Sequence, residues 1–170
     1  THLLQKDEPL TFTGKYYQFT DAVLLPRPVR PGGPPILIGG NGVKRTLPLA
    51  ARYADEWNAV YIPVETFRER NDLLTGMITT EKRDPGKVRR SMMNGLVFAG
   101  TEKALQEKLQ TRDLNRLQSA GVVIGTPDQL AAQFDTLAEA GVQRLILQWL
   151  DLSDLKGLEL LASVMQDWAN

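Results

Sequence analysis

Residues 34–58 read PPILIGGNGVKRTLPLAARYADEWN, and this stretch decides how the chain folds. A short apolar run leads into the loop Gly39-Gly40-Asn41-Gly42, after which come a helical stretch and a second strand-like segment. Strand, loop and helix in this order form one β/α unit. Because no side chain of the loop is larger than an amide, its backbone N–H groups can closely approach an anion or a flat ring.

The same order recurs along the chain. Strands are predicted at residues 36–38, 54–60, 91–98 and 142–150, and helices at residues 43–53, 63–78, 102–118, 127–140 and 158–168. Residues 121–125 are predicted to be either extended or a linker. Pro48 interrupts the first helix, which therefore either begins near Thr46 or is kinked. The clearest helix start is at Thr126, where an N-cap hydroxyl precedes Pro127 and Gln129 completes a capping box.

Repeated β/α units predict an α/β fold with a parallel sheet and right-handed crossovers. Residues 34–170 hold four such units. A closed (β/α)8 TIM barrel has eight units and needs about 250 residues, so the four units are predicted to form half of one. An open doubly wound sheet is the alternative. Residues 1–33 are predicted to form an irregular segment with a possible hairpin around Gly14, since prolines follow at a density that excludes a helix or a central strand.

The composition favours chemistry on small molecules. A formal net charge of zero removes the bulk electrostatic argument for a nucleic-acid or membrane partner. The absence of cysteine excludes disulfides and thiolate ligands, and a single histidine, His2, cannot build a triad or a multi-histidine metal site, so no metal is predicted. Without a long apolar stretch or a signal pattern, a cytoplasmic location is expected; a start at Thr1 fits a processed chain or a fragment.

The glycine loop narrows the class of ligand. No Gly-Lys-Ser/Thr follows it, so it is not a P-loop, and the third glycine of G-x-G-x-x-G is missing. A tight strand-to-helix turn without a ligand is the alternative interpretation. Lys44 and Arg45 follow the loop, where they could meet a phosphate, although each taken alone is more typical of a solvated surface charge.

Other side chains are candidate ligand contacts because they lie at the ends of predicted strands. Trp57 and Asn58 end the second strand, where they could contact a flat heterocycle, but Trp57 could equally be core. Gln148, Trp149 and Asp151 lie at the C-terminal end of the last strand, where barrel enzymes place their sites.

Two pairs of adjacent charged residues are not predicted to belong to a functional site. Asp55 and Glu56 point to opposite faces of a strand and cannot act as a carboxylate pair. Arg89 and Arg90 are predicted to face solvent.

Four blocks of the sequence together resemble the C-terminal half of luciferase-like monooxygenases. They are GKYYQF at 14–19, PRPVRPGGPPILIGGNG at 26–42, LAARYADEWN at 49–58 and GTPDQLAAQFDTLAEAGVQRLIL at 125–147. The resemblance covers about residues 10–168 and is strongest to oxidoreductases that use the deazaflavin coenzyme F420. It implies a (β/α)8 barrel of which this chain holds strands five to eight.

The resemblance also implies a set of cofactor contacts. Carried over by position, they are Ile38, Gly39, Gly40, Asn41 and Gly42 after strand five, and Trp57, Asn58 and Ala59 at the end of strand six. Glu56 departs from the family, which usually has glycine at this position, and could crowd or recharge the pocket. The family's strands one to four have no counterpart here, so the catalytic acid or base is expected to be absent and the catalytic residues are unknown.

Two functions follow as hypotheses. The first is an oxidoreductase that transfers hydride between F420, which is favoured, or FMN and a small organic substrate, represented here by its cofactor-binding half and inactive alone. The second is a non-catalytic half-barrel that binds a phosphorylated ligand or a partner chain, because half a barrel leaves two sheet edges unpaired. Either way the missing N-terminal half or a homo-oligomer is expected as partner.

Overall fold

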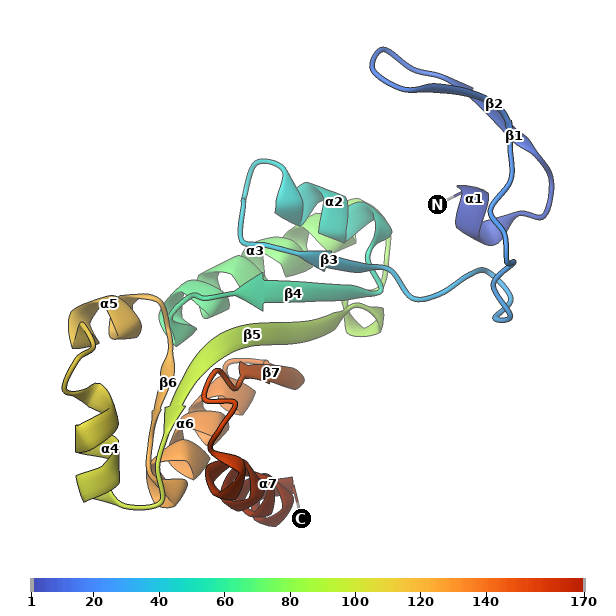
Figure 1. Cartoon of the computed structure of the whole chain (residues 1–170). Helices are drawn as coiled ribbons and strands as arrows, with labels where there is room; N and C mark the ends of the chain where they lie inside the picture. Colours follow the sequence, from blue (N-terminus) through green and yellow to red (C-terminus); the bar gives the residue numbers. More distant parts are fainter. Residues whose placement is uncertain (1, 170) are drawn as a thin grey trace. The chain divides into compact units, whose positions relative to one another are not determined.

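The computed structural model describes residues 2–169, with only the backbone described at residues 167–169 (Figure 1). The chain divides into two compact units, Thr1–Ile36 and Leu37–Asn170. The sequence placed this boundary after Gly33, inside the same proline-rich segment. Each unit is described below by itself.

The first unit is small and mostly irregular. Helix α1 (His2–Gln5) precedes strands β1 (Leu10–Thr13) and β2 (Gln18–Ala22), which pair in antiparallel orientation. Gly14 lies in the hairpin turn, where its N–H donates to the carbonyl of Tyr17 at 2.9 Å. Phe12 and Phe19 stack across the strands with ring centroids 5.5 Å apart.

The second unit is built on a parallel sheet. Strands β3 (Leu37–Gly39), β4 (Glu56–Val60), β5 (Arg89–Phe98) and β7 (Arg144–Gln148) lie side by side in chain order, and β6 (Val123–Gly125) pairs with the last residues of β5. Gly39 lies opposite Asn58, and Gly95 opposite Gln148. The order does not reverse around the first strand, as a doubly wound sheet would require. The α/β class with a parallel sheet is therefore confirmed.

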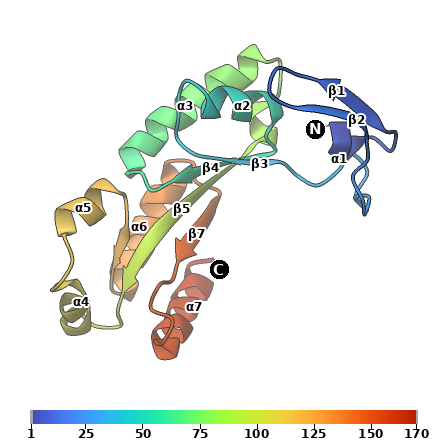
Figure 2. The same cartoon turned by 45° about the horizontal axis from the view of Figure 1, so that its top comes forward.

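The helices connect these strands (Figure 2). They are α2 (Thr46–Tyr53), α3 (Val64–Thr80), the 3-10 helix η1 (Pro85–Lys87), α4 (Glu102–Leu109), α5 (Leu114–Ser119), α6 (Pro127–Glu139) and α7 (Leu155–Ala169). Pro48 causes no kink, because α2 begins at Thr46 and the proline lies in its first turn. The capping box at Thr126 is present. The single helix predicted at 102–118 is wrong: it breaks at 110–113, where the side chain of Asp113 accepts from the N–H of Arg116 and starts α5.

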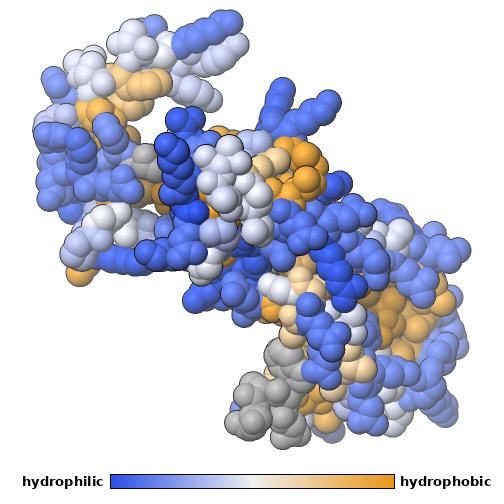
Figure 3. Space-filling model, turned by 180° about the vertical axis from the view of Figure 1, so that it is seen from behind, coloured by the Kyte–Doolittle hydropathy of each residue, from blue (hydrophilic) through white to orange (hydrophobic). Residues whose placement is uncertain are grey.

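Alternate residues of the strands turn toward the helices and form the helix face of the sheet. Trp57 on β4 is fully buried and stacks on Phe67 of α3, with ring centroids 5.4 Å apart. Met92 on β5 and Leu130 of α6 are fully buried in the same core. Seen from behind, the unit is mainly hydrophilic with separate apolar patches (Figure 3), as expected for helices that bury one stripe each.

The prediction that both Arg89 and Arg90 face solvent is wrong for Arg90, which is only 6% exposed. Neighbouring strand residues point to opposite faces, so one of the two must enter the helix layer. Arg90 Nε donates to Asn71 Oδ1 at 2.8 Å and its Nη2 to Thr75 Oγ1 at 3.1 Å, both on α3. Loss of water lowers the pKa of its guanidinium from its usual value.

The opposite face of the sheet, called the open face here, carries polar side chains and glycines together with four apolar side chains. Its residues are Leu37, Gly39, Glu56, Asn58, Val60, Arg89, Ser91, Met93, Gly95, Arg144, Ile146 and Gln148. Leu37 and Ile146 are 49% and 38% exposed, so solvent reaches this face at both edge strands. The C-terminal ends of the parallel strands meet at one edge, where ligands bind in α/β folds.

A lysine on α4 fastens that helix to the β7–α7 loop. Lys108 Nζ lies 2.8 Å from Asp154 Oδ2 and 3.1 Å from Asp151 Oδ2, and its ammonium sits 5.5 Å from the ring centroid of Trp149. Burial opposes the charged form of Lys108, but the hydrogen bonds to both carboxylates outweigh it and raise its pKa. The hydrogen bond from Lys108 and that from the N–H of Gly157 lower the pKa of Asp154.

These shifts predict how the contribution of Lys108 to stability depends on pH. The lowered Asp154 pKa means that its contribution is present above the usual carboxyl value of 3.8 and disappears as pH falls through the folded-state pKa. The raised Lys108 pKa means that its contribution is present below 10.5 and disappears as pH rises through the folded-state pKa. Lys108→Ala should lower the urea midpoint at pH 7, and the difference from the parent should shrink toward pH 3. Lys103 is an exposed lysine on the same helix, and Lys103→Ala should leave the urea midpoint unchanged at both pH values. If Lys108→Ala lowers the urea midpoint equally at pH 7 and pH 3, the prediction is wrong.

No helix in the described part of the chain is long and apolar enough to cross a membrane. Among those residues, no group of three or more acidic or histidine side chains is placed to hold a metal ion.

Candidate functional site

The glycine loop is held at the C-terminal edge of the sheet by four hydrogen bonds. Asn41 Nδ2 donates to the carbonyl of Val60 at 2.6 Å, and the N–H of Val60 donates to Asn41 Oδ1 at 3.0 Å. Trp57 Nε1 donates to the carbonyl of Gly40 at 2.8 Å, and the N–H of Gly40 donates to the carbonyl of Asn58 at 2.9 Å. The loop is thus fixed on β4 before any ligand arrives.

The loop also presents unused donors and bare backbone. Among the described residues, no hydrogen bond is found for the backbone N–H groups of Asn41 and Gly42. Gly40 has φ +118°, a conformation that other residues rarely adopt. A Cβ on Gly42 would lie 3.1 Å from Thr46 Oγ1, so the turn into α2 is closed to side chains. Such a loop can receive an anion or the edge of a ring through its backbone.

Asn58 and Ser91 continue the site below the loop on the open face. Asn58 Nδ2 donates to Ser91 Oγ at 2.9 Å, and Ser91 Oγ donates to the carbonyl of Trp57 at 3.3 Å. Asn58 is 6% exposed and Ser91 is fully buried, so this polar pair is fixed by the sheet.

Tyr61 follows β4 at the same edge and was missed by sequence reasoning. Its φ is +50°, which is unusual for a residue with a bulky side chain. Its hydroxyl donates to Gln148 Oε1 on β7, and its ring passes Gly95, where a Cβ would lie 3.2 Å from Tyr61 Cε1. A side chain at Gly95 would make this contact tighter than usual, so the glycine gives the tyrosine room to cross β5. Gln148, a candidate from its position at a strand end, is therefore part of this edge.

The predicted contacts divide between the two faces. Gly39 and Asn58 belong to the open face. Ile38, Trp57 and Ala59 belong to the helix face, where Trp57 and Ala59 are fully buried. Trp57 thus takes the core position that the sequence left as an alternative, and it acts on the loop only through its indole N–H.

The charged and aromatic candidates near the site lie apart from the loop's own donors. Lys44 and Arg45 are exposed beyond the loop. The indole N–H of Trp149 donates to the carbonyl of Asp151 at 2.7 Å, and the Asp151 carboxylate meets Lys108. These two residues therefore serve the β7–α7 loop.

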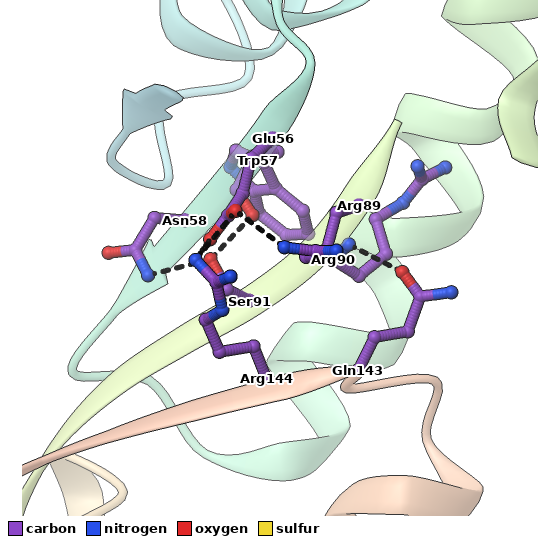
Figure 4. Close-up of polar contacts among 8 residues, drawn as sticks. All are labelled: Glu56, Trp57, Asn58, Arg89, Arg90, Ser91, Gln143 and Arg144. Carbon is purple, nitrogen blue, oxygen red and sulfur yellow. Dashed lines mark hydrogen bonds and ion pairs between the residues drawn. The ribbon is translucent and has the colours of Figure 1, made fainter. Parts of the chain in front are cut away.

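Glu56 lies at the N-terminal end of the strands, away from the glycine loop. Figure 4 shows its carboxylate facing Arg89 and Arg144 from the two strands beyond, at 3.7 and 3.1 Å. Glu56 is 7% exposed, whereas both arginine side chains are about half exposed (51% and 49%). The departure from glycine at this position therefore does not crowd the loop; it creates an ion cluster at the opposite end of the open face.

Replacing Asn41 with alanine should free the glycine loop without disturbing the sheet. Both hydrogen bonds to Val60 would disappear, which costs roughly 1 kcal/mol each at a half-buried position. We expect amide hydrogen exchange to accelerate at Gly40 and Val60 and to stay unchanged in β5. Asn41→Asp keeps the acceptor for the Val60 N–H but turns a carboxylate oxygen toward the Val60 carbonyl, so it should also accelerate exchange at these amides. Exchange at the parental rate in both variants would contradict this role of Asn41.

The chain was compared with known proteins. The family model of luciferase-like monooxygenase matches residues 1–120. None of the curated proteins compared with the chain matches it. The chain belongs to the luciferase-like monooxygenase family.

Solved structures share the fold. An F420-dependent secondary alcohol dehydrogenase in complex with an F420–acetone adduct matches with a TM-score of 0.72 at 18% identity, over 85% of this chain and 51% of its own. A monooxygenase from Streptomyces bottropensis matches with a TM-score of 0.76 at 18% identity, over 99% and 58%. The oxygenating constituent of 3,6-diketocamphane monooxygenase from Pseudomonas putida, in complex with FMN, gives 0.69 at 14% identity, over 95% and 58%. The chain thus spans little more than half the length of these structures.

Proposed function

We propose that the chain is the C-terminal, cofactor-binding half of an F420- or FMN-dependent oxidoreductase. In this proposal β3, β4, β5 and β7 are strands five to eight of a (β/α)8 barrel, and the open face is the barrel interior. The observation that carries it is the glycine loop: its free N–H groups at Asn41 and Gly42 stand at the C-terminal edge, where barrel enzymes bind ligands. Family membership and the shared fold support it. We expect it to act in the cytoplasm.

The residues present fit a flavin-type group. Gly39 is exposed on the open face, so a flat ring meets bare backbone there. The loop donors suit a phosphate or polyol oxygen, and Glu56, a buried carboxylate of this face, is at the far end of the strands. The Asn58–Ser91 pair supplies neutral polar groups beneath the loop.

The bound cofactor would supply hydride transfer to or from a small organic substrate, and FMN would add chemistry with oxygen. The chain's own residues hold and orient. Asn41 and Trp57 keep the loop in one conformation, so its donors need no rearrangement on binding. Tyr61 and Gln148 close the same edge with a hydroxyl and an amide that can face a substrate.

The catalytic acid or base belongs, in this proposal, to strands one to four, which are outside this sequence. The chain alone should then bind the cofactor weakly and turn over no substrate. The edge strands β3 and β7 are where the missing N-terminal half, or a second copy of the chain, would add strands. F420 is favoured over FMN on the sequence blocks.

Titration of the chain with FMN and with F420 tests the proposal through ligand fluorescence and amide chemical shifts. We expect shifts at Asn41 and Gly42, and weaker binding by Asn41→Ala than by the parent. A chain that binds neither cofactor, even when the N-terminal half is supplied, would overturn it. Shifts at the same amides with inorganic phosphate but with neither cofactor would favour the alternative, a non-catalytic half-barrel for phosphorylated ligands.

A further inference from the structure

An open surface pocket, called the cavity here, lies beside Tyr61 and has no glycine-loop residue in its lining. It has a volume of about 500 Å³ and lies between the end of β4 and α5. Its polar lining is Tyr61, Arg112, Asp113 and Arg116. Because the Tyr61 hydroxyl reaches Gln148 on the open face, one wall of this cavity is also a wall of the candidate site.

The two arginines of the cavity have no acidic partner within the described part of the chain. Among the described residues, no ion pair joins Arg112 or Arg116 to a carboxylate, whereas Arg89 and Arg144 share Glu56. Asp113 is the one acid in the lining, and its Oδ1 accepts from the backbone N–H of Arg116 at 3.1 Å, which commits it to starting α5. Two guanidiniums against one carboxylate leave the lining with a net positive charge. Planar guanidiniums are the preferred partners of carboxylate and phosphate.

The segment that carries the arginines is anchored to the rest of the unit. Leu105 and Leu109 of α4 are buried with Val97 at the end of β5, and Leu117 of α5 packs on the same cluster. Lys108 ties α4 to the β7–α7 loop through its two ion pairs. Both arginines are exposed, but the backbone that carries them is anchored, which lowers the backbone part of the ordering cost of binding.

We propose that this cavity receives an anionic group, a carboxylate or a phosphate, on the molecule that occupies the site. The inference rests on the proposed function and narrows it: either the substrate is an acid or a phosphate ester, or the cavity receives the phosphate of the cofactor. Two sources share this chemistry, the substrate and the phosphate of the cofactor, and the experiment below separates them.

Inorganic phosphate is the first probe, followed by amide and arginine side-chain shifts at constant ionic strength. We expect saturable shifts at Tyr61 and Arg116, and affinity lower by about tenfold or more in the double variant Arg112→Gln/Arg116→Gln, since both charged donors are lost. The matched double variant Arg68→Gln/Lys103→Gln removes two exposed cations elsewhere and should bind like the parent. Parental affinity in the first variant would overturn the proposal. The single variant Arg116→Gln, expected to lose part of the affinity, serves if the double variant does not fold.

FMN and riboflavin then distinguish the sources. If the double variant weakens FMN binding but not riboflavin binding, the cavity takes the cofactor's phosphate. If both bind as in the parent while phosphate binding is lost, the cavity serves the substrate's anion. Phosphate shifts at Arg116 together with no binding of FMN or F420, with the N-terminal half supplied, would overturn the proposed function and leave an anion site; normal cofactor binding with no phosphate shifts would overturn the anion site alone.

Discussion

Trp57→Ala is expected to lower the free energy of unfolding by about 3–5 kcal/mol, the usual range for removing a large buried aromatic side chain. Trp57 is fully buried, and its ring stacks on Phe67 at an interplanar angle of 13°. The substitution removes this contact between sheet and helix and leaves a cavity between β4 and α3. It also releases the carbonyl of Gly40, which Trp57 Nε1 contacts at 2.8 Å. Urea unfolding followed by circular dichroism measures the loss.

Trp57→Phe separates the two roles of the indole. Phenylalanine keeps a ring against Phe67 but has no N–H, so one hydrogen bond disappears, at a cost of about 1 kcal/mol plus that of the smaller ring. The loop should then exchange its amides faster even though most of the packing is retained. If Trp57→Ala costs less than about 1 kcal/mol, the ring is not part of the core that fixes β4.

Arg90→Met should have the second-largest effect, a loss of about 2–4 kcal/mol, because methionine fills similar space but leaves several buried groups without partners. Arg90 Nη1 donates to the carbonyls of Val88 and Pro85, while Nε and Nη2 reach α3 through Asn71 and Thr75. The side chain thus fastens β5, η1 and α3 together. Removing these buried donors is costly because their acceptors stay buried and lose their hydrogen-bond partners.

The adjacent Arg89→Met is the matched control. Arg89 is on the open face, its side chain is 51% exposed, and its ion pair with Glu56 is 3.7 Å long. Half-exposed pairs of this length contribute at most about 1 kcal/mol. Equal losses from the two substitutions would show that the faces of β5 are assigned wrongly. Thermal and urea unfolding at pH 7 suffice for the comparison.

The order of elements could be predicted from the sequence because it depends on local signals. Pro48 and the capping box at Thr126 mark helix starts within a few residues, and the glycine loop marks the strand end before it. The face of the sheet to which a strand residue belongs is harder to predict from the sequence. β5 is buried on both sides, so its sequence lacks the alternation that would have separated Arg90 from Arg89.

The candidate site could be predicted only in part. The glycines of the loop predict that its backbone groups are open to a ligand. The partner of Asn41 could not be predicted, because it is Val60, 19 residues away, and depends on the register of β3 against β4. Tyr61 gives no signal in the sequence: its role depends on a positive φ and on Gly95 in another strand. Long-range register and unusual backbone angles are the part of a site that spacing does not encode.

The cluster of Glu56 with Arg89 and Arg144 has a consequence for whatever covers the open face. Two guanidiniums share one carboxylate, so a charge of one remains uncompensated, and both arginines are still about half hydrated. An apolar cover would remove that water without replacing its hydrogen bonds. The desolvation cost would exceed the gain from apolar contact with Leu37 and Ile146. The charge at the N-terminal end of this face therefore disfavours an apolar cover and favours a neighbour that brings an acid or leaves the arginines hydrated.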